Sequence, residues 1–204
     1  MLPKRIARPI LIATTAMATA AAVAAACNAY GASRQAEASL PTIPTLDLAR
    51  YAGVWHEVAR LPSWFQRRCA GPAQATYTLR GDGRLQVHNS CQTENGDALD
   101  AEGIGEPASA EHPGQLRVSF APAWLRALGI GWGDYWILAL SEDYEWSLVG
   151  TRDRKYLWIL ARDPALDQKT LQHLVERARS FGYPVDALQF TGTAHRPETG
   201  PLPH

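Results

Sequence analysis

The strongest strand signal in the chain is the stretch Tyr51-Ala52-Gly53-Val54-Trp55-His56-Glu57-Val58-Ala59-Arg60. Its side chains alternate with a period of two, so that Trp55, Glu57 and Ala59 share one face of the predicted strand. Gly53 has no Cβ and lets a second backbone segment come close, while the large indole of Trp55 fills a cavity. We therefore expect the rest of the fold to be built around this strand.

Seven further strand-like segments follow, separated by turn residues. Asn95-Gly96 and Gly81-Asp82-Gly83 are signals for tight turns between antiparallel strands. The predicted strands cover residues 73–80, 84–93, a segment with Ala101, Gly103 and Gly105, 115–120, 132–141, 144–151 and 155–162. Residues 121–131 contain two glycines and several apolar side chains, which predicts a long apolar loop.

After Pro164 the hydrophobic period changes to that of a helix. Its apolar face consists of Leu171, Leu174, Val175, Ala178 and Phe181. Asp167 is the predicted N-cap, Gly182 and Pro184 end the helix, and a short strand is expected at 188–191. The pattern alone predicts an all-β barrel or sandwich with one helix.

Three motifs resemble the signatures of the lipocalin family, in the form found in bacterial outer-membrane lipoprotein lipocalins. They are Gly53-Val54-Trp55 with the residues up to Arg60, Gly133-Asp134-Tyr135, and the segment 154–162, which ends at Arg162. The resemblance implies an eight-stranded up-and-down antiparallel barrel over residues 46–192, with the C-terminal helix packed outside. It also implies structural roles for Gly53, Trp55, Asp134, Tyr135 and Arg162. Arg162 is expected to stack on the Trp55 indole at the closed end, and Asp134 to lie beside the barrel base. His56 departs from the family pattern, which usually has tyrosine there.

The first 26 residues read as a secretory signal peptide, with a basic start and an uncharged run from Ile10 to Ala26. The small residues before Cys27 resemble a bacterial lipobox, which predicts an acylated Cys27 carrying chains such as palmitate; ordinary cleavage with an incidental cysteine is the alternative. Residues 27–45 are then a lipidated tether and 193–204 a disordered tail. In well-studied bacteria, the residue after the acylated cysteine directs the sorting of lipoproteins between the membranes. Because Asn28 is not aspartate, this rule predicts the outer membrane of a Gram-negative envelope.

Export leaves Cys69 and Cys91 as the remaining cysteines, and an oxidising compartment predicts a disulfide between them. The family resemblance agrees, since many relatives carry cysteines at the corresponding places. The alternative is a free, nucleophilic Cys69, as in the enzymatic branch of the lipocalins.

Catalysis and nucleic-acid binding are not expected. The six histidines show no metal-ligand spacing, and the chain contains no nucleophile elbow, phosphate loop or dinucleotide motif. A formal net charge of zero argues against a nucleic-acid partner. The sequence therefore predicts a protein without enzymatic activity, and it implies no cofactor and no metal.

A barrel of eight strands leaves room for one small ligand. Alternation predicts six cavity residues: Glu57, Tyr77, Asn89, Trp136, Leu138 and Trp146. The alternative is that these aromatics fill a closed core. A carboxylate inside an apolar barrel needs a partner. Glu57 could be held by Tyr77 or Asn89, or could bind a ligand's polar head.

Apolar and basic side chains are expected together in the loops at the open end. They include Trp64, Phe65, Trp124, Leu125 and Leu128 beside Arg67, Arg68, Arg126, Arg152, Arg154 and Lys155. This combination suits a membrane surface or an anionic amphiphile. An inward-folded lid and a homodimer interface remain open alternatives.

These observations and the resemblance predict a protein that binds, stores or transports lipophilic ligands, namely fatty acids or lysophospholipids, at the cell envelope. Two alternatives remain. One is a lipocalin-fold enzyme that acts on a lipid, sterol or carotenoid. The other is a filled barrel whose mouth binds a protein partner.

Overall fold

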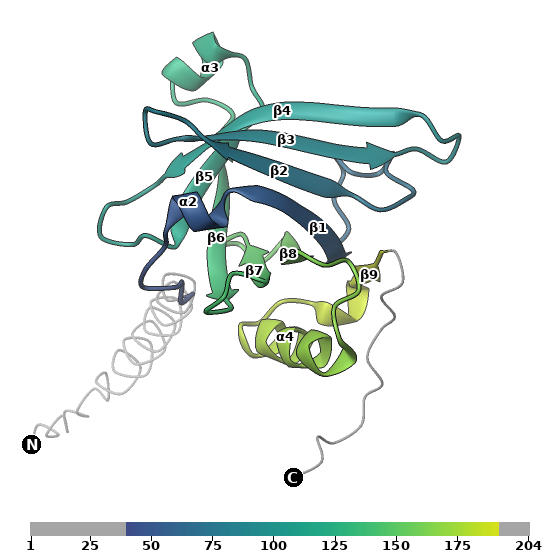
Figure 1. The fold of residues 1–204 in the computed structure, drawn as a ribbon. Helices are drawn as coiled ribbons and strands as arrows, with labels where there is room; N and C mark the ends of the chain where they lie inside the picture. The colour runs from purple at the N-terminus through teal and green to yellow at the C-terminus, as the bar shows by residue number, and fades with distance from the viewer. Residues whose placement is uncertain (1–39, 192–204) are drawn as a thin grey trace, which may run out of the picture. The chain divides into compact units, whose positions relative to one another are not determined.

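The computed structural model describes residues 40–191. The predicted signal peptide, Cys27, the first part of the tether and the tail from 193 lie outside the described residues. Eight strands follow one another in an antiparallel meander (Figure 1). They are β1 (Gly53–Arg60), β2 (Gln74–Leu79), β3 (Leu85–Gln92), β4 (Ala98–Pro107), β5 (Gln115–Ser119), β6 (Gly133–Leu140), β7 (Trp146–Gly150) and β8 (Leu157–Ala161).

The barrel is closed because β1 pairs with both of its neighbours. Its first half pairs with β2, from Gly53 opposite Tyr77 to His56 opposite Gln74, and its second half pairs with β8. The ninth strand, β9 (Gln189–Phe190), takes the edge that β2 leaves, with Phe190 opposite Ala59. The predicted eight-stranded up-and-down barrel is confirmed.

The predicted C-terminal helix is α4 (Gln168–Ser180), and it packs outside the barrel. The Asp167 carboxylate accepts a hydrogen bond from the Thr170 amide at 2.9 Å, as expected of an N-cap. The helix ends before Gly182, whose φ of +84° is readily adopted only by glycine. The short 3₁₀ helix η1 (Val185–Ala187) then leads into β9. Among the described residues, no helix is long and apolar enough to cross a membrane.

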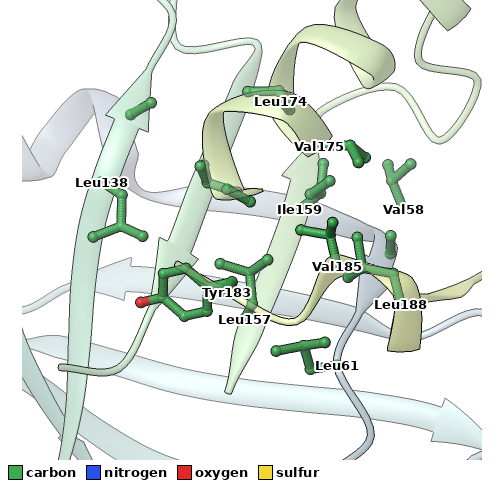
Figure 2. Packing of buried hydrophobic residues seen from close by; sticks show 14 of the residues in the cluster. Val58, Leu61, Leu138, Leu157, Ile159, Leu174, Val175, Tyr183, Val185 and Leu188 are labelled. Carbon is green, nitrogen blue, oxygen red and sulfur yellow. The ribbon is translucent and has the colours of Figure 1, made fainter. Parts of the chain in front are cut away.

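Two hydrophobic cores lie on opposite faces of the same strands. One lies between α4 and the outer face of β1, β6, β7 and β8, and contains Leu138, Leu157, Ile159 and Leu174 (Figure 2). The other lies inside the barrel and includes Tyr51, Trp55, Tyr77, Ile137 and Val149. Strands β6, β7 and β8 are therefore mainly apolar on both faces.

Two short helices replace segments that the sequence predicts otherwise. Tyr51 belongs to α2 (Leu48–Tyr51), capped by the Asp47 carboxylate, so the first strand begins at Gly53 and not at Tyr51. The apolar loop 121–131 contains α3 (Ala123–Ala127), whose N-cap residue makes no side-chain hydrogen bond. Both helices are shorter than the windows in which helical periodicity can be recognised.

Candidate ligand-binding site

The barrel encloses a cavity of about 840 Å³. This volume lies within the range of small-molecule sites in proteins. Apolar and aromatic side chains dominate its wall. Lining residues include Tyr51, Phe65, Ala75, Tyr77, Leu85, Val87, Leu116, Val118, Phe120, Trp132, Tyr135, Tyr156, Trp158 and Leu160.

Arg162 seals one end of the barrel against main-chain carbonyls. Its guanidinium carbon lies 3.9 Å from the centroid of the Trp55 ring, which confirms the predicted cation–π contact. It also donates to the carbonyl oxygens of Val54 at 2.7 Å, Arg50 at 2.8 Å and Ala52 at 2.9 Å. These carbonyls belong to the end of α2 and the start of β1, so Arg162 fixes where the first strand begins.

Gly53 is required at this end for two reasons. Its φ of +102° is unfavourable for other residues, and a Cβ placed there would lie 3.1 Å from Nη1 of Arg162. The predicted close approach at Gly53 is thus made by the Arg162 side chain, where the sequence led us to expect a second backbone segment.

Tyrosine hydroxyls form a connected group inside the cavity, beside the closed end. The Tyr135 hydroxyl lies 2.9 Å from those of Tyr51 and Tyr77, and the Tyr51 hydroxyl lies 3.1 Å from Oγ of Ser147. Burial raises the pKa of Tyr51 to about 12 and the pKa values of Tyr77 and Tyr135 well above their ordinary value. All three are therefore neutral phenols at physiological pH and act as hydrogen-bond donors and acceptors. We call Tyr51, Tyr77, Tyr135 and Ser147 the tyrosine cluster.

Glu57 lines the cavity, but both of its carboxylate oxygens already have partners. Oε1 accepts from Nη1 of Arg60, and Oε2 accepts from the Gln66 amide at 2.8 Å. The Gln66 oxygen in turn accepts from the Trp158 indole at 3.1 Å. The prediction that Tyr77 or Asn89 holds the Glu57 carboxylate is wrong. A bulge between Glu57 and Ala59 turns the Arg60 side chain toward Glu57. The same bulge places Ala59 in the outer core, where simple alternation predicted the inner face.

Tyr77 and Asn89 line the cavity, as the alternation of β2 and β3 predicts. Oδ1 of Asn89 is buried and has no hydrogen-bond partner among the described residues. A contact of any of these side chains with a ligand stays a prediction.

The predicted inward positions of Trp136, Leu138 and Trp146 are wrong. All three belong to or pack against the outer core beneath α4, where Figure 2 shows Leu138. Tyr135 and Ile137 belong to the core inside the barrel. Alternation identifies the two faces of a strand but does not say which is inside. Because α4 covers the outer face of β6 and β7, the side chains on that face are as apolar as those inside. The sequence therefore does not show which face of these two strands points into the barrel.

The resemblance implied that Asp134 lies beside the closed end. The structure places it near the mouth instead. It lines the cavity at the start of β6, and its Oδ2 is 3.6 Å from Nε of Arg152 in the β7–β8 loop. The closed end instead holds Tyr144, whose hydroxyl accepts from the Asp47 amide at 3.0 Å and whose ring stacks on Arg50. The chain contains the pair Asp-Tyr twice, at 134–135 and at 143–144. The second pair, Asp143-Tyr144, was the sequence signal that could have identified the residues at the closed end.

The open end carries exposed apolar side chains on two loops. Trp64 is 70% exposed in the β1–β2 loop, and Trp124 and Leu128 are 65% and 68% exposed in the β5–β6 loop. They do not fold inward as a lid. These loops, residues 61–73 and 120–132, contain three arginines and no acidic residue. None of the three, Arg67, Arg68 and Arg126, forms an ion pair with another described residue.

A disulfide joins Cys69 in the β1–β2 loop to Cys91 at the end of β3, as predicted. It ties this loop to the barrel wall and excludes the reading of Cys69 as a free nucleophile. Within residues 40–191, no group of three or more histidine, cysteine, aspartate or glutamate side chains could hold a metal ion.

A closed antiparallel barrel with one sealed end and an apolar cavity defines a class of proteins that bind small molecules. Residues 46–193 match the family model described as a lipocalin-like domain. The chain belongs to the lipocalin family, whose members generally bind or transport small hydrophobic molecules.

Relatives with substantial identity include proteins from plants and bacteria. Temperature-induced lipocalin-1 of Arabidopsis thaliana is 36% identical over 162 residues, which cover 78% of this chain and 85% of that protein. Outer membrane lipoprotein Blc of Escherichia coli K12 is 33% identical over 176 residues, covering 86% of this chain and 93% of that protein. Insecticyanin from Manduca sexta shares the fold, with a TM-score of 0.58, 21% identity, and coverage of 74% of this chain and 82% of that one.

Proposed function

We propose that this protein binds fatty acids or lysophospholipids in the barrel cavity and stores or carries them at the cell envelope. The observation that carries the proposal is the apolar cavity of about 840 Å³. Two loops at the mouth of this barrel, residues 61–73 and 120–132, carry three arginines and no carboxylate. Such a site offers apolar surface to an acyl chain and positive charge to an anionic head. The role is one of binding, without covalent chemistry.

The proposed location is the outer membrane of a Gram-negative envelope, with attachment through an acylated Cys27 after removal of residues 1–26. The proposed tether 27–45 then leads into the barrel. Support comes from the basic, uncharged and small-residue pattern before Cys27 and from the name of the Blc relative, an outer membrane lipoprotein.

The experiment uses the chain from Asn28 onward, which includes both hydrophobic cores and the disulfide. A fluorescent fatty acid is titrated into the protein and then displaced with palmitate, lysophospholipid or retinol. Saturable binding that lysophospholipid and palmitate reverse supports the proposal. A folded barrel that binds none of these lipids would contradict it, and would favour a filled core with a protein partner at the mouth.

Charge reversal at the mouth is expected to slow the uptake of anionic ligands. Replacing Arg67 and Arg68 by glutamate puts negative charge beside the cavity entrance, so the association rate of palmitate should fall about ten-fold at low salt. The difference should shrink as salt screens these exposed charges. Stopped-flow measurement with a fluorescent fatty acid gives the rate.

The matched control is Lys169→Glu with Arg177→Glu, which changes the net charge equally on the exposed face of α4. This control should leave the rate almost unchanged, and retinol, a neutral ligand, should enter both variants normally. Equal palmitate uptake by the wild type and the Arg67/Arg68 variant would rule out electrostatic steering.

A further inference from the structure

The tyrosine cluster contains more donor protons than its own hydrogen bonds can use. Three contacts join its four hydroxyls, between Ser147 and Tyr51, Tyr51 and Tyr135, and Tyr135 and Tyr77. Each hydroxyl has one proton to donate, and each contact uses one proton. One proton of the four is therefore left over, whichever way the bonds run.

The position of Ser147 decides where the spare proton lies. Ser147 is fully buried, and the only hydrogen-bond partner of its Oγ among the described residues is the Tyr51 hydroxyl. An unpaired donor at such a place is costly, so Ser147 donates to Tyr51. The spare proton then belongs to one of the three tyrosines, all of which line the cavity. Tyr51 is fully buried, which leaves Tyr77 and Tyr135 as the hydroxyls within reach of a ligand.

The charges around the cavity determine what kind of acceptor suits this proton. Among the described residues that line the cavity, Arg117 is the one cationic side chain, and it is bound to Glu106 and stacked on Trp132. Arg162 lies near the cluster but donates to main-chain carbonyls and does not line the cavity. An anion at the cluster would find no free cation, whereas a neutral oxygen needs none.

The same charges indicate which way an amphiphile enters. The cavity-lining carboxylates of Glu57, Asp134 and Asp153 are paired with Arg60, Arg152 and Lys155. At the mouth, water and the arginines of loops 61–73 and 120–132, which have no carboxylate partner among the described residues, can surround a charge. An anionic head is therefore favoured at the mouth, and the far end of the acyl chain approaches the tyrosine cluster. A methyl group there would displace water and leave the spare proton unpaired.

We propose that Tyr77 and Tyr135 determine specificity for amphiphiles that carry a neutral oxygen, as a hydroxyl or carbonyl group, at the end of the acyl chain remote from the head. The spare phenolic proton donates to this oxygen at the inner end of the cavity. The inference rests on the proposed function and adds to it the chemistry of the buried end of the ligand.

The experiment compares 16-hydroxypalmitate with palmitate, by displacement of a fluorescent fatty acid from the chain that starts at Asn28. The wild type should bind 16-hydroxypalmitate at least as tightly as palmitate. In the double variant Tyr77→Phe, Tyr135→Phe, the terminal hydroxyl of 16-hydroxypalmitate would be buried without a hydrogen-bond partner. The affinity for 16-hydroxypalmitate relative to that for palmitate should therefore fall about ten-fold. The ratio of the two dissociation constants cancels any general effect of the substitutions on binding.

The matched control is Tyr156→Phe, which removes a cavity-lining hydroxyl outside the tyrosine cluster. It should leave the ratio unchanged. The same ratio in the wild type and the folded double variant would overturn the inference. If neither ligand binds the folded wild type, the proposed function itself fails, so the two failures can be told apart.

A ligand series decides the question if the double variant does not fold. The isomer 8-hydroxypalmitate has the same composition but would bury its hydroxyl at mid-chain, away from the cluster. The wild type should bind 16-hydroxypalmitate about ten-fold more tightly than this isomer. Equal affinities for the two isomers would overturn the inference.

Discussion

Replacing Arg60 by methionine is expected to lower the free energy of unfolding by about 3–5 kcal/mol, because it leaves a buried carboxylate without its cation. The side chains of Glu57 and Arg60 are only 5% and 8% exposed, so water can do little to replace the lost partner. Gln66 would still donate to Glu57, but an amide carries no charge. Urea denaturation followed by tryptophan fluorescence measures the loss.

The control for this prediction removes both charges at once. In the double variant Glu57→Gln, Arg60→Met, the amide oxygen introduced at position 57 can still accept from Gln66 and no buried charge remains. Its stability should lie within about 1–2 kcal/mol of the wild type, since neutral replacements of a buried ion pair are often tolerated. A loss of less than about 1 kcal/mol in the single variant would show that water reaches Glu57 in the folded protein.

The double variant also separates structure from ligand binding. Because Arg60 and Gln66 occupy both oxygens of Glu57, we infer that the carboxylate holds the β1–β2 loop to the barrel. Fatty-acid affinity should then remain within about two-fold of the wild type, a difference well under 1 kcal/mol.

Replacing Arg162 by alanine is expected to destabilise the barrel by about 3 kcal/mol, since hydrogen bonds from a charged group contribute more than neutral ones. The substitution removes the stacking partner of Trp55 and the donor for the carbonyls of Arg50, Ala52 and Val54. Water can hydrate some of these carbonyls, which limits the loss. A lower urea midpoint with an unchanged slope is the expected result.

Two comparison variants test whether the geometry of the guanidinium matters. Arg162→Lys keeps the charge but not the planar fork, so we expect it to recover less than half of the lost stability. Arg50→Ala removes a similar stack, 4.1 Å from the Tyr144 ring, but only one main-chain bond, and should cost about 1 kcal/mol or less. If Arg50→Ala proved as costly as Arg162→Ala, the carbonyl contacts of Arg162 would not be what seals the barrel.

The candidate site was predictable where a strand has one apolar and one polar face. Tyr77 and Asn89 line the cavity as expected because their strands, β2 and β3, carry polar side chains on the outside. The same reasoning failed for Trp136 and Trp146, because α4 covers the outer face of their strands. Both faces of β6 and β7 are therefore apolar, and alternation does not show which of them is inside.

Periodicity and turn residues predicted the order of the eight strands and the C-terminal helix, and the expected export predicted the disulfide. The contact between Arg162 and Trp55 was implied by the resemblance of the motifs to those of the lipocalins. These features depend on local periodicity, on turn residues and on motifs of fixed spacing, all of which are present in a linear chain. Only the tertiary structure decided that Glu57 pairs with Arg60 and that Tyr51, Tyr77 and Tyr135 share hydrogen bonds. The first depends on a bulge of one residue, and the second on closure of the barrel, which brings together side chains up to 84 positions apart.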